Sequence, residues 1–319
     1  MRDAFIARLT QLAAEDPRVF LITGDLGFGV LTRFATERPR QYLNVGVAEQ
    51  NMTGVATGLA LEGRVVFTYS IANFPTLRCL EQIRNDAAYH RANVKIVAIG
   101  GGFSYGQLGM SHHATEDLAI LRAIPEVTVV SPGCLWEAEE ATSAILRTQG
   151  TCYLRLDKSD AGRTNQAGER FELGRIRTVR EGDDLTLVAT GGILGEALKA
   201  ADQLAAQGIR ARVLSVHTIK PFDQETILRA ARETGGIVTV EEHMAEGGLG
   251  SLVAETCLEG GVAPKGFGRV AIRGGFASVV GAQQYLRTRY GLDAAAIAAR
   301  ALDVHQGKLP FVGAGTEGR

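Results

Sequence analysis

The chain has 319 residues, longer than one hydrophobic core usually supports, so two domains of about 150 residues each are expected. Its 34 basic and 35 acidic residues nearly cancel, and apolar residues make up 45% of the sequence. This balance is typical of a globular protein and gives no reason to expect a nucleic-acid or membrane partner. Neither a signal peptide nor a membrane-spanning run is recognisable, so the cytoplasm is the expected location.

In the first half of the chain, short apolar runs alternate with longer amphipathic stretches. This alternation is typical of a mostly parallel sheet with helical crossovers, so we expect the α/β fold class. Strands are predicted at 19–23, 65–69, 94–99 and 127–130. Helices are predicted between them at 48–61 and 77–89.

A polar stretch rich in Gly and Arg then precedes a second series of apolar runs. We therefore place a first domain at 1–162, a linker at 163–182 and a second domain at 183–319. The run Glu241-Glu242-His243 is expected to line a subunit interface or to lie in a solvated loop, and 309–319 is expected to be a mobile tail. Strands of the second domain are predicted at 185–190, 211–216, 236–241 and 269–272.

The cysteine pattern argues against a zinc site, and the glycine pattern argues against a nucleotide-binding site. The four cysteines stand singly among apolar residues, so buried free thiols are expected rather than zinc ligands. The clusters Gly100-Gly101-Gly102 and Gly247-Gly248-Leu249-Gly250 do not complete a dinucleotide fingerprint, and the sequence contains no Gly-x-x-x-x-Gly-Lys-Ser/Thr loop. The cysteines are Cys79, Cys134, Cys152 and Cys257.

Three segments carry side chains suited to chemistry. Glu49 begins a helix whose other residues are mostly apolar or small, so its carboxylate should be partly desolvated. A favourable interaction with the helix dipole would be a simpler explanation for an acid at this position. Phe74 follows a buried strand, at the sheet edge where ligands bind in α/β proteins, although it could also be plain core. The loop 106–117 delivers Ser111-His112-His113 to the start of a helix, where solvated imidazoles are the alternative.

In this order and spacing, the three segments resemble the C-terminal half of transketolase, and the likeness extends through 217–223 to 247–251. In that family, the matching acid binds the aminopyrimidine ring of thiamine diphosphate and drives it to the imino tautomer, which forms the ylide. The resemblance implies that Glu49 is this acid. It also implies that Phe74 stacks on the ring beside Ile71.

The resemblance implies further site residues. Thr23-Gly24-Asp25-Leu26 is similar to a family turn whose leucine supports the bent cofactor, so Leu26 and the adjacent Asp25 are cofactor candidates. His112 would face the substrate and shuttle protons, with Ser111 and His113 beside it in the substrate site.

The metal site of the family is missing. The sequence contains no Gly-Asp-Gly motif, which in transketolases helps to hold the metal and the diphosphate. The resemblance therefore implies that a partner chain with that motif holds Mg²⁺ (or Ca²⁺), as in split transketolases. An α2β2 assembly is expected, with self-association through the pyrimidine-binding and C-terminal domains.

Several positions depart from the family pattern near the substrate. Leu108 replaces an aspartate, Gly29 lies near the family's serine and Gly100 near its histidine, while Arg155 and Lys158 only approximate a family arginine. Each lost charge-assisted hydrogen bond is worth about 1.5–3 kcal/mol. An acceptor other than an ordinary sugar phosphate is therefore expected.

The leading hypothesis is the C-terminal subunit of a split transketolase, an enzyme that transfers a two-carbon ketol unit from a ketose to an aldehyde. The first alternative is the beta subunit of a 2-oxoacid dehydrogenase or a deoxyxylulose-phosphate-synthase-like carboligase. The second alternative is a non-catalytic assembly subunit that kept the fold and lost turnover.

Overall fold

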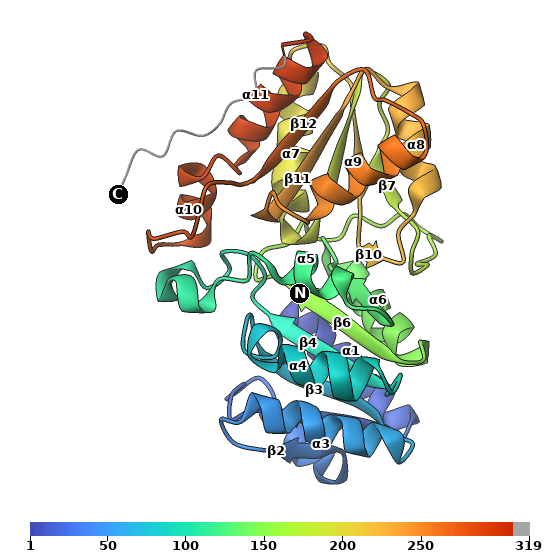
Figure 1. Ribbon diagram of the computed structural model, residues 1–319, viewed down its shortest axis with the longest axis vertical. Helices are drawn as coiled ribbons and strands as arrows, with labels where there is room; N and C mark the ends of the chain where they lie inside the picture. Colours follow the sequence, from blue (N-terminus) through green and yellow to red (C-terminus); the bar gives the residue numbers. More distant parts are fainter. Residues whose placement is uncertain (309–319) are drawn as a thin grey trace.

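The computed structural model describes residues 1–308, and its first sheet has seven strands, of which six come from the first half of the chain (Figure 1). The strand order is β10-β5-β6-β4-β3-β1-β2, and all neighbours are parallel except β10 and β5. Every residue of β4 and β6 is buried, as expected for central strands of a parallel sheet. The strands are β1 (Val19–Thr23), β2 (Tyr42–Asn44), β3 (Val65–Ile71), β4 (Val94–Ile99), β5 (Val127–Val130), β6 (Thr151–Leu156) and β10 (Thr218–Lys220).

Helices cover both faces of this sheet. One face packs against α1 (Arg2–Glu15), α2 (Thr32–Glu37) and α6 (Leu135–Arg147). The other face packs against α3 (Glu49–Leu61), the segment 77–88 and α5 (Asp117–Ala123). The predicted helix 77–89 is in fact three short pieces: a 3₁₀ turn η2 (Leu77–Cys79), α4 (Leu80–Gln82) and a wider π turn η3 (Ile83–Ala88).

The second half forms a five-stranded sheet in the order β12-β11-β8-β9-β7, parallel except for β7. One face is covered by α7 (Leu194–Ala205) and α11 (Ala294–His305), and the other by α8 (Gln224–Glu233) and α9 (Leu249–Glu259). The short helix α10 (Gln283–Arg289) lies near the junction of the two halves (Figure 1). The strands are β7 (Arg177–Arg180), β8 (Leu185–Thr190), β9 (Ala211–Ser215), β11 (Ile237–Met244) and β12 (Phe267–Ile272).

The two halves are joined by more than a linker, because strands cross between their sheets. Within the segment expected as a linker, 163–182, β7 pairs with β9 in the second sheet. In return, β10 of the second half pairs with β5 in the first sheet. The expected tail 309–319 lies outside the described residues.

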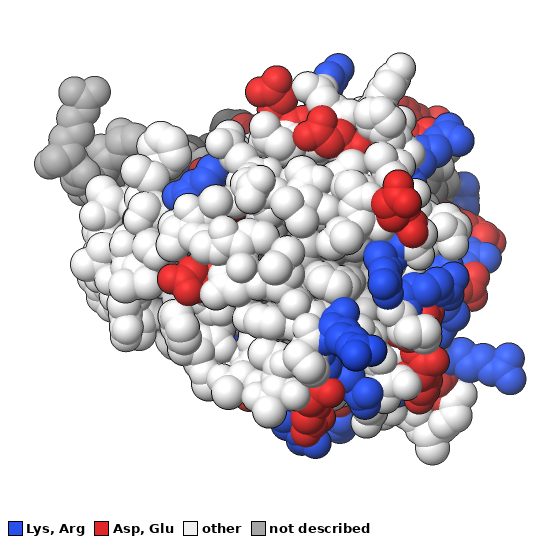
Figure 2. Space-filling model, turned by 90° about the horizontal axis from the view of Figure 1, so that it is seen from below, with Lys and Arg blue, Asp and Glu red and all other residues white. Residues whose placement is uncertain are grey.

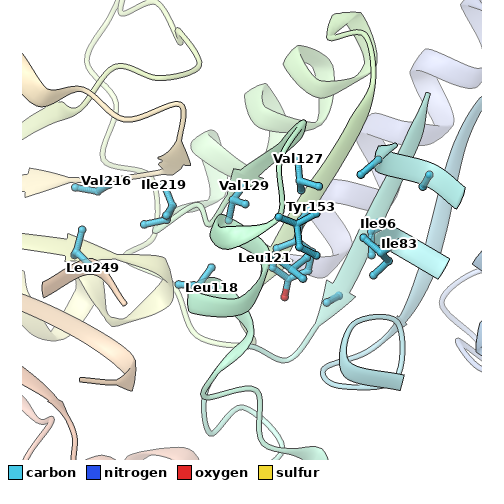
Figure 3. Close-up of a cluster of buried hydrophobic side chains, with 14 of the residues drawn as sticks. Ile83, Ile96, Leu118, Leu121, Val127, Val129, Tyr153, Val216, Ile219 and Leu249 are labelled. Carbon is cyan, nitrogen blue, oxygen red and sulfur yellow. The ribbon is translucent and has the colours of Figure 1, made fainter. Parts of the chain in front are cut away.

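One apolar cluster runs across the boundary between the halves. Leu118 and Val129 from the first half belong to the same cluster as Val216, Ile219 and Leu249 from the second (Figure 3). Because burial of continuous apolar surface stabilises the contact, the halves are held in one arrangement. Among residues 1–308, no helix is both long and apolar enough to cross a membrane.

Candidate active site

Glu49 is buried at the first residue of α3, where its side chain is only 3% exposed. An acid in the first turn is favoured by the positive end of the helix dipole. The guanidinium of Arg78 donates to it, with 2.7 Å between Nη1 and Oε2. The carboxylate therefore sits in a largely dry position and already holds a planar N–H donor.

The turn after β1 lies directly against Glu49. A Cβ on Gly24 would be 3.3 Å from the carbonyl oxygen of Gly46 and 3.6 Å from Cγ of Glu49, so only a small residue fits comfortably. Asp25 is exposed and has a φ of 54°, a left-handed conformation that costs energy in a residue other than glycine. Leu26, next along the turn, is half-buried.

Asn44 holds this turn in place. Its Oδ1 accepts hydrogen bonds from the backbone N–H groups of Asp25 (2.9 Å) and Gly46 (3.0 Å). Its Nδ2 donates to Oδ1 of Asp25 at 3.1 Å. Asn44 thus ties the turn after β1 to the segment that leads into Glu49, a role that no sequence pattern indicated.

Phe74 connects Glu49 to the histidine loop. The guanidinium carbon of Arg78 lies 4.6 Å from the centre of the Phe74 ring, and the imidazole of His112 meets the same ring edge-on at 5.1 Å. Ile71 is half-buried at the end of β3, and its carbonyl accepts from the N–H of Phe74 at 2.9 Å. The structure therefore brings Glu49, Phe74 and His112 together through Arg78, a residue that no sequence pattern indicated.

The two histidines have different surroundings. His112 is half-buried, and Oγ of the exposed Ser111 lies 3.0 Å from its Nδ1. Partial burial lowers the pKa of His112 below its ordinary value of about 6.5, so the neutral imidazole predominates at pH 7. His113 is buried, its ring meets Phe103 edge-on at 5.0 Å, and burial lowers its pKa as well. His112 faces the ring of Phe74, whereas His113 packs inside.

Two positions that depart from the family pattern have packing explanations. Gly100 has a φ of 102°, and a Cβ there would lie 2.2 Å from the ring of Tyr105, so no larger side chain fits. Arg155 is fully buried between Asp117 and Asp157 and is a structural residue. Lys158 places its Nζ 3.6 Å from the centre of the Tyr105 ring. Leu108 and Gly29 are exposed.

The run Glu241-Glu242-His243 is not a solvated loop, because all three residues lie within β11 and are at most 1% exposed. The carboxylate of Glu241 accepts from the N–H groups of Leu249 (2.7 Å) and Gly250 (2.8 Å) at the start of α9. Burial nevertheless raises the pKa of Glu241 to about 7. The second glycine cluster therefore binds a carboxylate of this chain.

The exposed surface near the site is partly apolar. Phe28 is 81% exposed and Val47 is 75% exposed, and these residues follow the Asp25 turn and precede Glu49, respectively. From below, charged side chains gather mainly on one side of the molecule and leave a broad uncharged area on the other (Figure 2).

Comparison with known proteins identifies both domains. The transketolase pyrimidine-binding domain matches residues 1–163, and the transketolase C-terminal domain matches residues 174–297. The 6-deoxy-6-sulfo-D-fructose transketolase subunit SqwH of Clostridium sp. is 40% identical over 309 residues, covering 97% of this chain and 95% of its own. An apulose-4-phosphate transketolase subunit of Phocaeicola vulgatus is 38% identical over 260 residues, covering 81% and 83%.

A solved structure described as a split gene transketolase in an inactive beta4 tetramer has the same fold. Its TM-score is 0.86 at 36% identity, and the match covers 97% of this chain and 98% of that one. Two family domains thus follow one another in the sequence, and a relative of similar length shares their arrangement. The chain belongs to the transketolase family.

Proposed function

We propose that this chain is the C-terminal subunit of a split, thiamine diphosphate-dependent transketolase that transfers a two-carbon ketol unit from a ketose to an aldehyde. The observation that carries the proposal is that Arg78 contacts both the buried carboxylate of Glu49 and the ring of Phe74, while the imidazole of His112 lies edge-on to that same ring. The names of the similar subunits favour this function over the dehydrogenase and carboligase alternatives.

The residues fit the pyrimidine ring of the cofactor. Glu49 can share a proton with a ring nitrogen where little water competes, and Phe74 offers a face for stacking. When bound, thiamine diphosphate supplies the carbon nucleophile that attacks a ketose carbonyl. The turn formed by Asp25 and Leu26, beside Ile71, would line the site.

His112 is proposed to move protons on the substrate. Its neutral imidazole can accept a proton from a sugar hydroxyl at pH 7, and its position against Phe74 keeps it beside the proposed cofactor ring. Ser111, whose hydroxyl lies next to Nδ1, would help to select the tautomer. His113 is proposed to support this loop from inside.

Arg78 contacts both groups that are proposed to hold the cofactor ring. Its guanidinium bonds Glu49 and lies over the ring of Phe74, so a pyrimidine ring bound as proposed would have to displace it from both. We predict that Arg78→Met raises the affinity of the assembled enzyme for thiamine diphosphate severalfold, measured by isothermal titration calorimetry. The free chain should lose about 1–2 kcal/mol of stability, because Glu49 then lacks its partner.

The matched control for this prediction is Arg84→Met. Arg84 is exposed on the same segment, and its only side-chain bond in the described part of the chain is to the neighbouring Asn85. Its replacement should change neither the affinity for thiamine diphosphate nor the stability of the free chain. A tenfold weaker affinity in Arg78→Met would instead mean that Arg78 helps to hold the bound cofactor or the substrate.

The partner chain is proposed to carry the Gly-Asp-Gly motif that is absent here, and to hold Mg²⁺ (or Ca²⁺) and the diphosphate. A second chain is proposed to complete the site, in an α2β2 assembly. The similar beta4 tetramer is described as inactive, which agrees with a need for a partner.

Four free, buried thiols support a cytoplasmic location, because disulfides are rare in the reducing cytoplasm.

The test is to search the neighbouring genes for a Gly-Asp-Gly transketolase subunit, to co-express it with this chain, and to assay two-carbon transfer with thiamine diphosphate and Mg²⁺. The donor and acceptor panel should include sulfonated and phosphorylated sugars, because similar subunits are named for both kinds. We expect transfer only with both chains present. Cofactor binding followed by decarboxylation of pyruvate would favour the dehydrogenase alternative, and no cofactor binding would favour the assembly subunit.

A further inference from the structure

The loop that carries His112 is closed at its base. Gly102 and Ala114 pair as an antiparallel bridge, with 2.8 Å from the N–H of Gly102 to the carbonyl of Ala114 and 3.0 Å for the reverse bond. The chain between them forms one excursion from the first sheet, with His112 near its end. The conformation of His112 therefore depends on what holds this base.

The second domain holds the base through Glu242. This residue of β11 is 1% exposed, and its Oε1 accepts from the backbone N–H of Phe103. A Cβ on Gly102 would lie only 2.5 Å from the same oxygen, so the carboxylate presses directly against the loop backbone. Its Oε2 accepts from Nε of Arg287, which is itself only 5% exposed.

Further contacts from the second domain reach the same loop. Gln283 donates from Nε2 to Glu242 at 2.9 Å and to the hydroxyl of Ser104 at 3.4 Å. The N–H of Gly281 donates to the carbonyl of Gly106 at 3.2 Å. The ring of Tyr290 stacks on Phe103 at 5.3 Å, and Phe103 in turn meets His113.

We propose that Glu242, held by Arg287, is a positioning residue for the reaction: the second domain clamps the base of the loop and thereby sets the imidazole of His112 against Phe74. The inference rests on the proposed role of His112. It assigns the C-terminal domain a part in the chemistry through its contacts with the histidine loop. A misplacement of about 1 Å at a catalytic group can cost up to about 10²-fold in rate.

The experiment compares Glu242→Gln with the wild-type enzyme, each co-expressed with the partner chain. We expect kcat for two-carbon transfer to fall about tenfold while the Kd of thiamine diphosphate changes by less than about threefold. Hydrogen–deuterium exchange of the amides in 102–114 should become faster. A merely structural role would instead lower cofactor affinity and kcat together.

Two further variants keep the test decisive. Gln283→Leu removes one donor to Glu242 from a half-buried position and should fold even if Glu242→Gln does not; we expect faster exchange in 102–114 and a smaller loss of kcat. Arg122→Met is the control, because Arg122 also bridges the domains, through the carbonyls of Gly247 and Gly248, without a bond to the loop.

The proposal is overturned if Gln283→Leu leaves both exchange and kcat unchanged, or if Arg122→Met lowers kcat as much as Glu242→Gln does. Amide exchange can be measured whether or not the enzyme turns over. An inactive wild-type enzyme would therefore contradict the proposed function, while exchange in 102–114 would still decide whether Glu242 clamps the loop.

Discussion

Glu49→Gln is expected to reduce two-carbon transfer about 10²–10⁴-fold, the range attributed to a positioned proton-transfer group. The amide keeps the shape of the carboxylate and can still accept from Nη1 of Arg78, which lies 2.7 Å from Oε2. It cannot share a proton with a ring nitrogen. Fold and assembly should therefore survive while the reaction fails.

The measurement is a coupled assay with the partner chain, together with the Kd of thiamine diphosphate and a thermal melt. Glu62→Gln is the control, because Glu62 is the exposed residue at the opposite end of α3. Glu62→Gln should leave the rate of transfer, the Kd of thiamine diphosphate and the melting temperature unchanged. Retention of a third or more of the wild-type rate in Glu49→Gln would show that no acid at this position drives the reaction.

Arg155→Met is expected to cost about 3–5 kcal/mol of the free energy of unfolding, the typical result of removing one partner from a buried ion pair. Arg155 is fully buried, with Nε 3.0 Å from Asp117 and Nη1 3.8 Å from Asp157. Its Nη2 donates to the carbonyls of Ala114 (3.1 Å) and Glu242 (2.9 Å), which belong to different domains. Methionine fills a similar volume but leaves two buried acids without a cation.

This loss should depend on pH. Burial raises the pKa of Asp157, and Arg155 opposes that rise. Without Arg155, the folded-state pKa moves further above the unfolded value, so the folded chain binds more protons than the unfolded chain and its stability falls as pH rises. The difference between variant and wild type should therefore be larger at about pH 8 than at about pH 5.

Urea unfolding at the two pH values tests this expectation. Arg33→Met is the control, because the Arg33–Glu37 pair lies at the surface, with 80% of the arginine side chain exposed, and such pairs contribute at most about 1 kcal/mol. A loss in Arg155→Met no larger than in this control would mean that water or a structural shift satisfies the two acids.

The α/β class and most of the central strands were predictable because their signal is local. The runs 19–23, 94–99 and 127–130 are apolar and β-branched over most of their length, and all three are confirmed as strands. Four strands were missed. β6 contains the charged Arg155, which interrupts the apolar run, and β2, β7 and β10 have three or four residues each and depend on a neighbour for their pairing.

The candidate site was predictable in part, for a related reason. Glu49, Phe74 and His112 stand at the ends of strongly patterned elements, and the structure places them close together. Arg78 and Asn44 were missed because their roles depend on contacts that form only in the folded chain. An arginine on a short helical turn, or an asparagine at the end of an edge strand, has no pattern that names its partner.

The sequence by itself determined the alternation of strands and helices, the lack of a Gly-Asp-Gly motif and the order of the three chemical segments, because these are properties of neighbouring residues. Only the tertiary structure decided that Glu241, Glu242 and His243 are buried within a strand rather than solvated. It also decided that Arg155 and Glu242 join the two domains beneath the histidine loop. A charged residue can be buried only where a distant partner satisfies it, and that partner is chosen by the fold.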